Sequence, residues 1–96
     1  MSHNHIGVGR RVLDIEARAV DALKDSLDDS FSAACDLMLA ARGRVIVTGM
    51  GKSGHVGSKL AATLASTGTP SFFVHPGEAS HGDMGMITPQ DVVIAI

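Results

Sequence analysis

The sequence predicts an α/β fold with a parallel, doubly wound sheet, and three observations carry that prediction. A β-branched apolar run at 45–47 leads through a glycine-rich turn into helical spacing that continues to Thr67. A second apolar run follows at 71–74 and a third at 91–96. Short apolar runs joined by a helix are typical of parallel strands that are buried on both faces. These runs are expected to be the first three strands of the sheet.

Two helices are predicted before the first strand. Residues 10–27 carry an apolar stripe with helical spacing, and a second stripe runs from Phe31 to Met38. Residues 1–9 are expected to be a mobile tail. The predicted organisation is therefore a tail at 1–9, a helical lead-in at 10–43 and the first half of an α/β domain at 44–96. Because the chain stops inside the third apolar run, we expect a domain truncated in that strand.

Composition excludes several classes of function. The chain has 96 residues, a net charge of −2, three phenylalanines and neither Trp nor Tyr. Few aromatic residues and no basic run argue against binding of single-stranded or duplex nucleic acid. No apolar stretch approaches the roughly 20 residues that span a bilayer, and the N-terminus lacks the apolar core of a signal peptide. With one cysteine, Cys35, and hence no internal disulfide, we expect a cytoplasmic protein.

The turn after the first strand has the features of an anion site. Gly49, Gly51 and Gly54 let the backbone approach a ligand closely, and the helix that follows begins with unpaired N–H groups. Lys52 and Ser53 add a positive charge and a hydroxyl in that turn. A tight strand-to-helix turn without a ligand is the alternative. The lysine and the serine favour an anionic ligand, most often phosphate.

Two nucleotide-binding motifs fail at this turn. The phosphate loop of nucleotide hydrolases needs a glycine where Ile46 stands. The three glycines match the dinucleotide fingerprint, but that motif also needs an acidic residue near the end of the second strand. The chain has His75 and Pro76 there, and the nearest acid is Glu78. A dinucleotide-binding enzyme is therefore a disfavoured alternative.

The connection after the second strand is dense in polar groups. If 77–82 forms a helical turn, Glu78 and His81 share one face. Parallel strands end at the same edge of a sheet, so His75 and His81 are expected near Lys52 and Ser53. Such a group could bind substrate, move protons or bind a metal. Capping and turn stabilisation is the alternative, since polar loop residues often serve the backbone.

With these residues in view, the chain resembles the sugar isomerase (SIS) domain of arabinose-5-phosphate isomerases. The resemblance covers about 44–96 and rests on the strings GMGKSGH and STGTPSFFVHPGEASHGDMGM. It implies a three-layer α-β-α domain with a flavodoxin-like sheet. It also implies an isomerase that interconverts D-ribulose 5-phosphate and D-arabinose 5-phosphate through a cis-enediol, for synthesis of 3-deoxy-D-manno-octulosonate in lipopolysaccharide or capsule. A non-catalytic SIS module that senses a sugar phosphate is the alternative.

The resemblance also implies roles for individual residues. Lys52 matches a catalytic lysine, and His81 also resembles a zinc-binding position, where zinc is inhibitory or structural and no cofactor is required. The implied partners are a sugar phosphate and further copies of the chain in a homotetramer, with sites at subunit interfaces. The residues implied to contact substrate are Gly51, Ser53, Gly68, Thr69, His75 and His81.

The chain departs from the family in what it lacks. The family's serine-rich phosphate loop with its glutamate is absent, and neither Glu78 nor Asp83 matches the family's base. We therefore expect the 96 residues alone to be inactive. Gly68 and Thr69 are predicted at the opposite end of the strands from Lys52, so they would contact the substrate of a neighbouring subunit.

Overall fold

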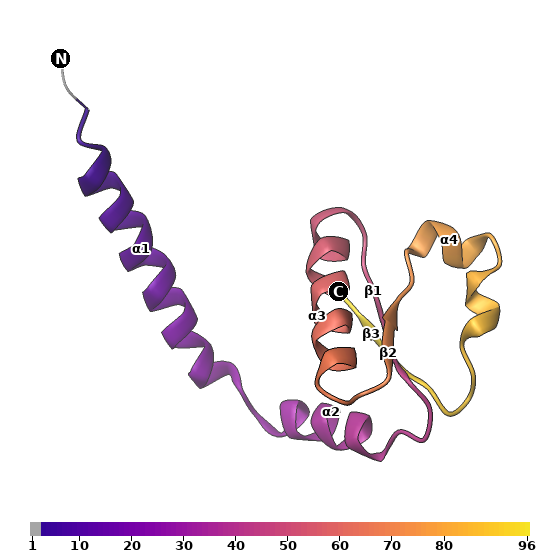
Figure 1. Cartoon of the computed structure of the whole chain (residues 1–96). Helices are drawn as coiled ribbons and strands as arrows, with labels where there is room; N and C mark the ends of the chain where they lie inside the picture. Colours follow the sequence, from indigo (N-terminus) through magenta and orange to yellow (C-terminus); the bar gives the residue numbers. More distant parts are fainter. Residues whose placement is uncertain (1–2) are drawn as a thin grey trace. The chain divides into compact units, whose positions relative to one another are not determined.

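The computed structural model describes residues 3–96, which divide into two compact units, one up to Ala34 and one of Cys35–Ile96. Figure 1 shows the elements in chain order. The first unit holds α1 (His5–Ala22), the short 3₁₀ helix η1 (Leu23–Ser26) and the start of α2 (Asp29–Ala40). Of the helices in residues 3–96, none is long and apolar enough to cross a membrane.

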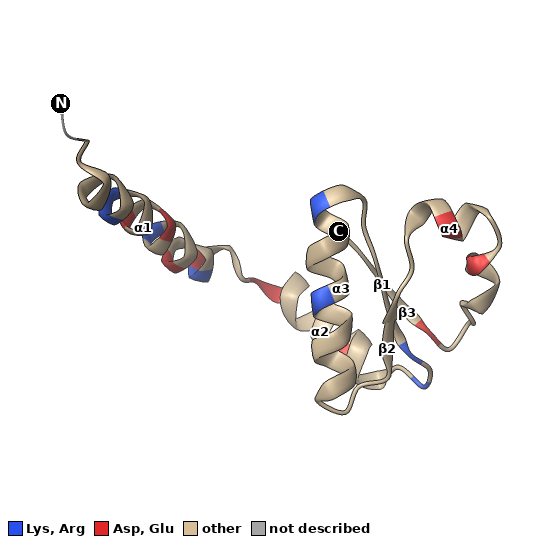
Figure 2. Cartoon of the chain, turned by 45° about the horizontal axis from the view of Figure 1, so that its top comes forward, with Lys and Arg blue, Asp and Glu red and all other residues tan. Residues whose placement is uncertain are grey.

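The bounds of the first helices differ from those predicted. α1 begins at His5, whereas the sequence predicted a tail up to Gly9; Met1 and Ser2 lie outside the described residues. The Asn4 side chain explains the early start, because its Oδ1 accepts a hydrogen bond of 3.0 Å from the Gly7 N–H. α1 contains no buried residue, and charged residues of both signs lie along it (Figure 2).

The second unit contains a parallel sheet in the order β2-β1-β3. Its strands are β1 (Val45–Thr48), β2 (Ser71–Phe73) and β3 (Val92–Ala95). The register pairs Ile46 with Phe72 on one side and with Val93 on the other. The three predicted strands and their parallel pairing are confirmed, with small differences at the strand ends.

One face of the sheet packs on α3 (Gly51–Ser66), as Figure 1 shows. Val45 and Val47 form the core with Ala61 of α3. Gly57 permits the close approach of helix and sheet, since a Cβ there would lie 3.1 Å from side-chain atoms of both Val47 and Phe73. Buried apolar side chains at this helix–sheet contact are the main favourable term in the stability of the unit.

The other face of the sheet meets α4 (Pro76–Ser80) and the 3₁₀ helix η2 (Asp83–Met86). Ile46 points to this side and is fully buried, so β1 is buried on both faces as predicted. A hollow of about 390 Å³ between Ile46, Val93 and Met84 remains there. Helix, sheet and helix form three layers, which confirms the predicted α/β class.

Candidate functional site

The candidate site begins where β1 turns into α3. Gly51 has φ +58°, a left-handed conformation that favours glycine, and a Cβ built on it would meet no atom within 4 Å. Gly54 also packs closely against the turn, because a Cβ built on it would lie 2.7 Å from the Gly49 carbonyl oxygen. The backbone of this turn is therefore compact and has open space at Gly51.

Among residues 3–96, no side chain caps the N-terminus of α3. Met50 occupies the cap position without a side-chain hydrogen bond, and the Gly54 N–H donates to the Met50 carbonyl at 3.3 Å. Lys52 is exposed and Ser53 half-buried in the first turn that follows. Free N–H groups at the positive end of a 16-residue helix attract an anion, and the Lys52 ammonium adds charge beside them.

His75 joins β2 to α4 at the same edge of the sheet. Its Nδ1 accepts a hydrogen bond of 3.0 Å from the Gly77 N–H, so the imidazole caps α4. In a neutral imidazole that accepts at Nδ1, the proton is on Nε2, which remains a donor. The capping interpretation of this loop therefore applies to His75, while its second nitrogen is free for a ligand.

His81 and Glu78 lie on and just after α4. The predicted helical turn is present, and the His81 N–H donates to the Glu78 carbonyl at 3.0 Å. Within residues 3–96, no hydrogen bond or ion pair joins their side chains, and no three His, Cys, Asp or Glu residues are grouped to hold a metal ion. The described residues therefore do not supply a complete set of zinc ligands around His81.

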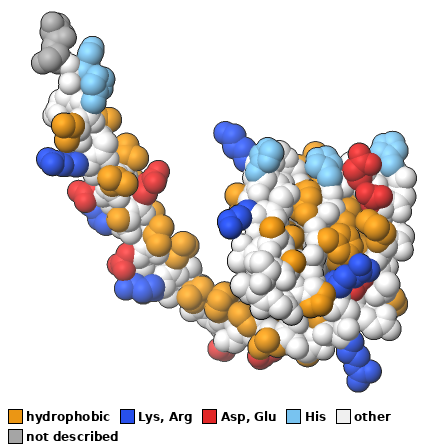
Figure 3. Space-filling model, viewed as in Figure 1, with side chains coloured by type: hydrophobic (Ala, Val, Ile, Leu, Met, Phe, Trp, Pro, Cys, Tyr) orange, Lys and Arg blue, Asp and Glu red, His pale blue; other side chains and the backbone are white. Residues whose placement is uncertain are grey.

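The structure brings some of the predicted residues together and separates others. Gly51 and His75 line one hollow of about 250 Å³, whereas Lys52, Ser53 and His81 lie outside its lining. Figure 3 shows the histidine side chains of Cys35–Ile96 gathered along one edge of that unit. The predicted residues Gly51, Lys52, Ser53, His75 and His81 therefore share the carboxyl edge of the sheet without forming a single cavity.

Gly68 and Thr69 lie at the opposite, amino edge. Gly68 follows α3 with φ +102°, and the Thr69 N–H donates to the Leu64 carbonyl at 2.9 Å. Thr69 lines a separate hollow of about 290 Å³ with Cys35, Met38 and other apolar residues. These two residues lie at the opposite end of the strands from Lys52, so they cannot contact a ligand that is bound at Lys52 of the same chain.

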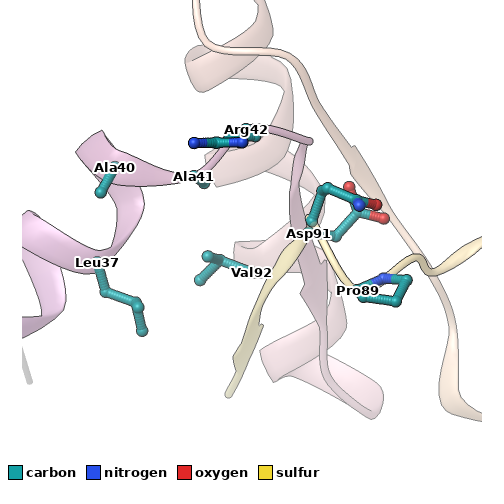
Figure 4. Close-up of a pocket in the computed structure, with 8 residues that line it drawn as sticks. Leu37, Ala40, Ala41, Arg42, Pro89, Asp91 and Val92 are labelled. Carbon is teal, nitrogen blue, oxygen red and sulfur yellow. The ribbon is translucent and has the colours of Figure 1, made fainter.

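A further hollow of about 340 Å³ also lies at the amino edge (Figure 4). Leu37 and Ala40 line it from α2, and Asp91 and Val92 line it from the start of β3. Asp91 is engaged by the backbone: its carboxylate accepts hydrogen bonds from the Arg44 N–H at 2.6 Å and the Thr88 N–H at 2.7 Å. None of the predicted site residues lies in this hollow.

Sequence reasoning missed two polar residues of the carboxyl-edge hollow, His55 and Ser58. Both lie on α3, four and seven residues after Gly51, which places the three residues on one helical face. That spacing is visible in the sequence. The sequence could not tell that this face of α3 lies toward the end of β2.

A family comparison identifies the domain. A model of the SIS domain family matches residues 38–96. The chain belongs to the SIS domain family. The match includes the whole parallel sheet and all of the carboxyl-edge residues described above.

Curated relatives of this SIS domain include two bacterial proteins. Arabinose 5-phosphate isomerase KdsD of Pseudomonas aeruginosa is 63% identical over 98 residues, covering 100% of this chain and 30% of the relative. KdsD of Escherichia coli K12 is 61% identical over 88 residues, covering 92% of this chain and 27% of the relative. The chain therefore spans less than a third of the curated relatives that it matches.

A solved structure supports the same fold. An Escherichia coli CFT073 protein in complex with arabinose 5-phosphate matches with a TM-score of 0.89 and 44% identity, over 98% of this chain and 51% of that chain. Its likeness extends through the three parallel strands and the helices between them. The three-layer SIS fold that the family resemblance implied is confirmed, and the chain spans about half of that structure.

Proposed function

We propose that this chain is the first part of an aldose–ketose isomerase that interconverts D-ribulose 5-phosphate and D-arabinose 5-phosphate. One observation carries the proposal: every residue of the chain lies within the 63%-identical match to a relative named arabinose 5-phosphate isomerase. The same carboxyl edge carries a lysine, three histidines and an uncapped helix N-terminus. These groups suit a phosphorylated sugar whose carbonyl becomes negatively charged during reaction.

The proposed chemistry moves one proton between neighbouring carbons. A base removes the proton from the carbon beside the carbonyl while the carbonyl oxygen takes up a proton, which gives a cis-enediol. The base then returns its proton to the former carbonyl carbon, as the neighbouring hydroxyl gives up its proton and becomes the new carbonyl. Lys52 stabilises the charge that develops on oxygen, and Ser53, Gly51 and the histidines His75 and His81 bind the substrate. The base would come from a part of the protein beyond this chain. The 96 residues alone are therefore expected to be inactive, and detectable turnover by them would contradict that.

The proposed assembly is a homotetramer in the cytoplasm that needs no cofactor. Its product would supply the synthesis of 3-deoxy-D-manno-octulosonate for lipopolysaccharide or capsule. Two features support sites shared between subunits. Gly68 and Thr69 lie at the edge opposite Lys52, so they would meet only the substrate of a neighbouring copy. Exposed apolar side chains on α1 offer a surface for such a neighbour. Among them, Leu13 is 68% exposed and Ile15 is 53% exposed. Zinc bound at His81 would inhibit or stabilise, and it takes no part in the proposed reaction.

The test is turnover of D-arabinose 5-phosphate to D-ribulose 5-phosphate by the full-length protein beside a Lys52→Ala variant. We expect activity in the wild type and a loss of about 10²-fold or more in the variant, because one preorganised charge partner of the transition state is gone. Lys59→Ala is the matched control, since Lys59 is also exposed on α3 but lies about two turns from Lys52. It should retain wild-type turnover.

Two results would redirect the proposal. Wild-type protein that binds the sugar phosphate without converting it would support the alternative of a non-catalytic sensor. In that case the turn before α3 would act only as a phosphate cradle. Equal losses in Lys52→Ala and Lys59→Ala would show that general charge, rather than the Lys52 position, supports the activity.

A further inference from the structure

The hollow at the carboxyl edge contains side chains to which no role has been given. Phe73 forms its apolar floor: its ring lies against Gly54 and Gly57, with Cζ 3.4 Å from a Cβ built on Gly54 and Cε2 3.1 Å from one built on Gly57. His55 and Ser58 of α3 form one wall, and His75 at the end of β2 lines the other side. The hollow thus joins an aromatic surface to three polar side chains.

The polar groups of this hollow have hydrogen-bonding capacity to spare. His75 uses Nδ1 for the Gly77 N–H and keeps the Nε2–H as a donor. In the described part of the chain, the side chains of His55 and Ser58 make no hydrogen bond. An imidazole and a hydroxyl can each donate and accept. Three side chains can therefore reach the same ligand with both donors and acceptors.

At Gly51, the rim of the hollow is formed by backbone without a side chain. Beyond the adjoining backbone, no atom lies within 4 Å of a Cβ built there, so a ligand can approach the start of α3 closely. A volume of about 250 Å³ lies below the roughly 300–1,000 Å³ of pockets for drug-sized ligands and suits a fragment of a few carbons. Neither lysine nor arginine lines the hollow, so its chemistry suits neutral hydroxyl groups better than a phosphate.

We propose that this hollow binds the hydroxyl-bearing carbon chain of the sugar phosphate, and that His55 is a substrate-binding residue that acts with Ser58 and His75. The Phe73 ring packs against the C–H groups of the sugar, and the imidazoles and the hydroxyl bond its hydroxyl groups. The phosphate lies outside the hollow, toward Lys52. The inference rests on the proposed substrate but does not need turnover, because it concerns binding alone.

The test is calorimetric binding of D-arabinose 5-phosphate, and separately of inorganic phosphate, to the full-length protein and its variants. His55→Ala should raise the Kd for the sugar phosphate roughly tenfold, as expected for the loss of one or two hydrogen bonds. Its Kd for inorganic phosphate should not change. His55→Gln keeps a donor and an acceptor and should recover part of the affinity. Val56→Ala is the control, since Val56 is exposed on α3 outside the hollow.

Each contrary result has its own meaning. An unchanged Kd for the sugar phosphate in His55→Ala overturns this inference while leaving the proposed isomerase intact. Equal weakening for sugar phosphate and inorganic phosphate would make the hollow a phosphate site, which also overturns it. Wild-type protein that binds no D-arabinose 5-phosphate would refute both proposals. Binding that depends on His55 without any turnover would support the inference and refute the isomerase.

Discussion

The two edges of the sheet use their polar side chains in opposite ways. At the amino edge, Asp91 accepts hydrogen bonds from the Arg44 and Thr88 N–H groups and from the Thr88 hydroxyl. At the carboxyl edge, α3 starts without a side-chain cap, and the side chains of Lys52 and His55 make no hydrogen bond or ion pair within the described residues. Figure 2 shows charged residues at both edges, so charge alone does not distinguish them.

The difference distinguishes polar side chains that stabilise the fold from polar side chains that are available to a ligand. Bonds within the protein at the amino edge join the starts of β1 and β3, which lie 47 residues apart in sequence. At the carboxyl edge, the side chains of His55 and Ser58 have no partner among the described residues, and His75 uses one ring nitrogen to cap α4 and leaves the other available, which is the arrangement a ligand site needs. The buried Ser71 hydroxyl is an exception at the amino edge, because it has no partner among the described residues.

The largest expected effect on stability comes from Gly54→Ala at the carboxyl edge. The new Cβ would lie 2.7 Å from the Gly49 carbonyl oxygen, a backbone atom that cannot move without opening the turn. We expect a loss of about 1–3 kcal/mol in the free energy of unfolding, together with reduced turnover, because the turn positions Lys52. Denaturant titration and turnover of the full-length protein measure the two effects.

Gly57→Ala is the matched control for this change. The atoms nearest to a Cβ built on Gly57 belong to the side chains of Val47 and Phe73, at 3.1 Å, which can shift more easily than backbone. The gain of about 1 kcal/mol in helix propensity offsets part of that cost. A Gly54→Ala protein as stable as Gly57→Ala would show that the Gly49 contact does not constrain the turn.

A smaller effect is expected from Asp91→Asn at the amino edge. The hydrogen bond from the Arg44 N–H, more than any other contact, lowers the pKa of Asp91 below its ordinary 3.8. A lowered pKa means that the carboxylate stabilises the folded state fully above pH 3.8 and loses this contribution as the pH falls through the lower folded value. Asp91→Asn should therefore be less stable than wild type at neutral pH, with unchanged turnover.

The pH dependence of that difference is the decisive readout. Urea midpoints of both proteins should converge as the pH is lowered below 3.8, because wild type then loses the charge that the variant lacks. A difference that stays constant with pH would mean that replacing an acceptor oxygen of Asp91 by an amide NH₂, and not the loss of charge, destabilises the edge. Reduced turnover in Asp91→Asn would contradict the separation between the two edges.

The smallest effect is expected from Arg44→Gln. The Arg44 guanidinium lies 4.7 Å from the centroid of the Phe72 ring and donates to the Met86 carbonyl at 3.3 Å. An exposed contact of this kind contributes about 0.5–1 kcal/mol, so the urea midpoint should fall slightly. Arg42→Gln at the same edge is the control and should not shift it. A shift as large as that of Gly54→Ala would show that Arg44 has a further role.

Much of the fold could be predicted because its signals are local. The β-branched run at Val45, the glycines of the turn and the spacing along α3 lie within a few residues of one another, and each restricts the backbone directly. The predicted start of α1 was wrong because a side-chain cap at Asn4 outweighs the low helix propensity of Gly7 and Gly9. Caps of this kind depend on one hydrogen bond and leave little trace in periodicity.

The carboxyl-edge residues were predictable only as a group. Strand direction predicts that Lys52 and His75 share an edge, because consecutive parallel strands end on the same side. Whether they share a cavity depends on how α3 is rotated about its axis. That rotation is set by the contacts of Gly54, Gly57 and Ala61 with the sheet, which turn His55 rather than Lys52 toward His75.

By itself, the sequence determined the order of strands and helices, the glycine turn and the edge at which the polar residues gather. Those features follow from local sterics and from apolar periodicity, which act over a few residues. Tertiary structure alone decided that Gly51, His55 and His75 line one hollow and that the Asp91 carboxylate is engaged by the backbone of Arg44. Both results depend on packing between segments distant in sequence, whose relative rotation no local pattern specifies.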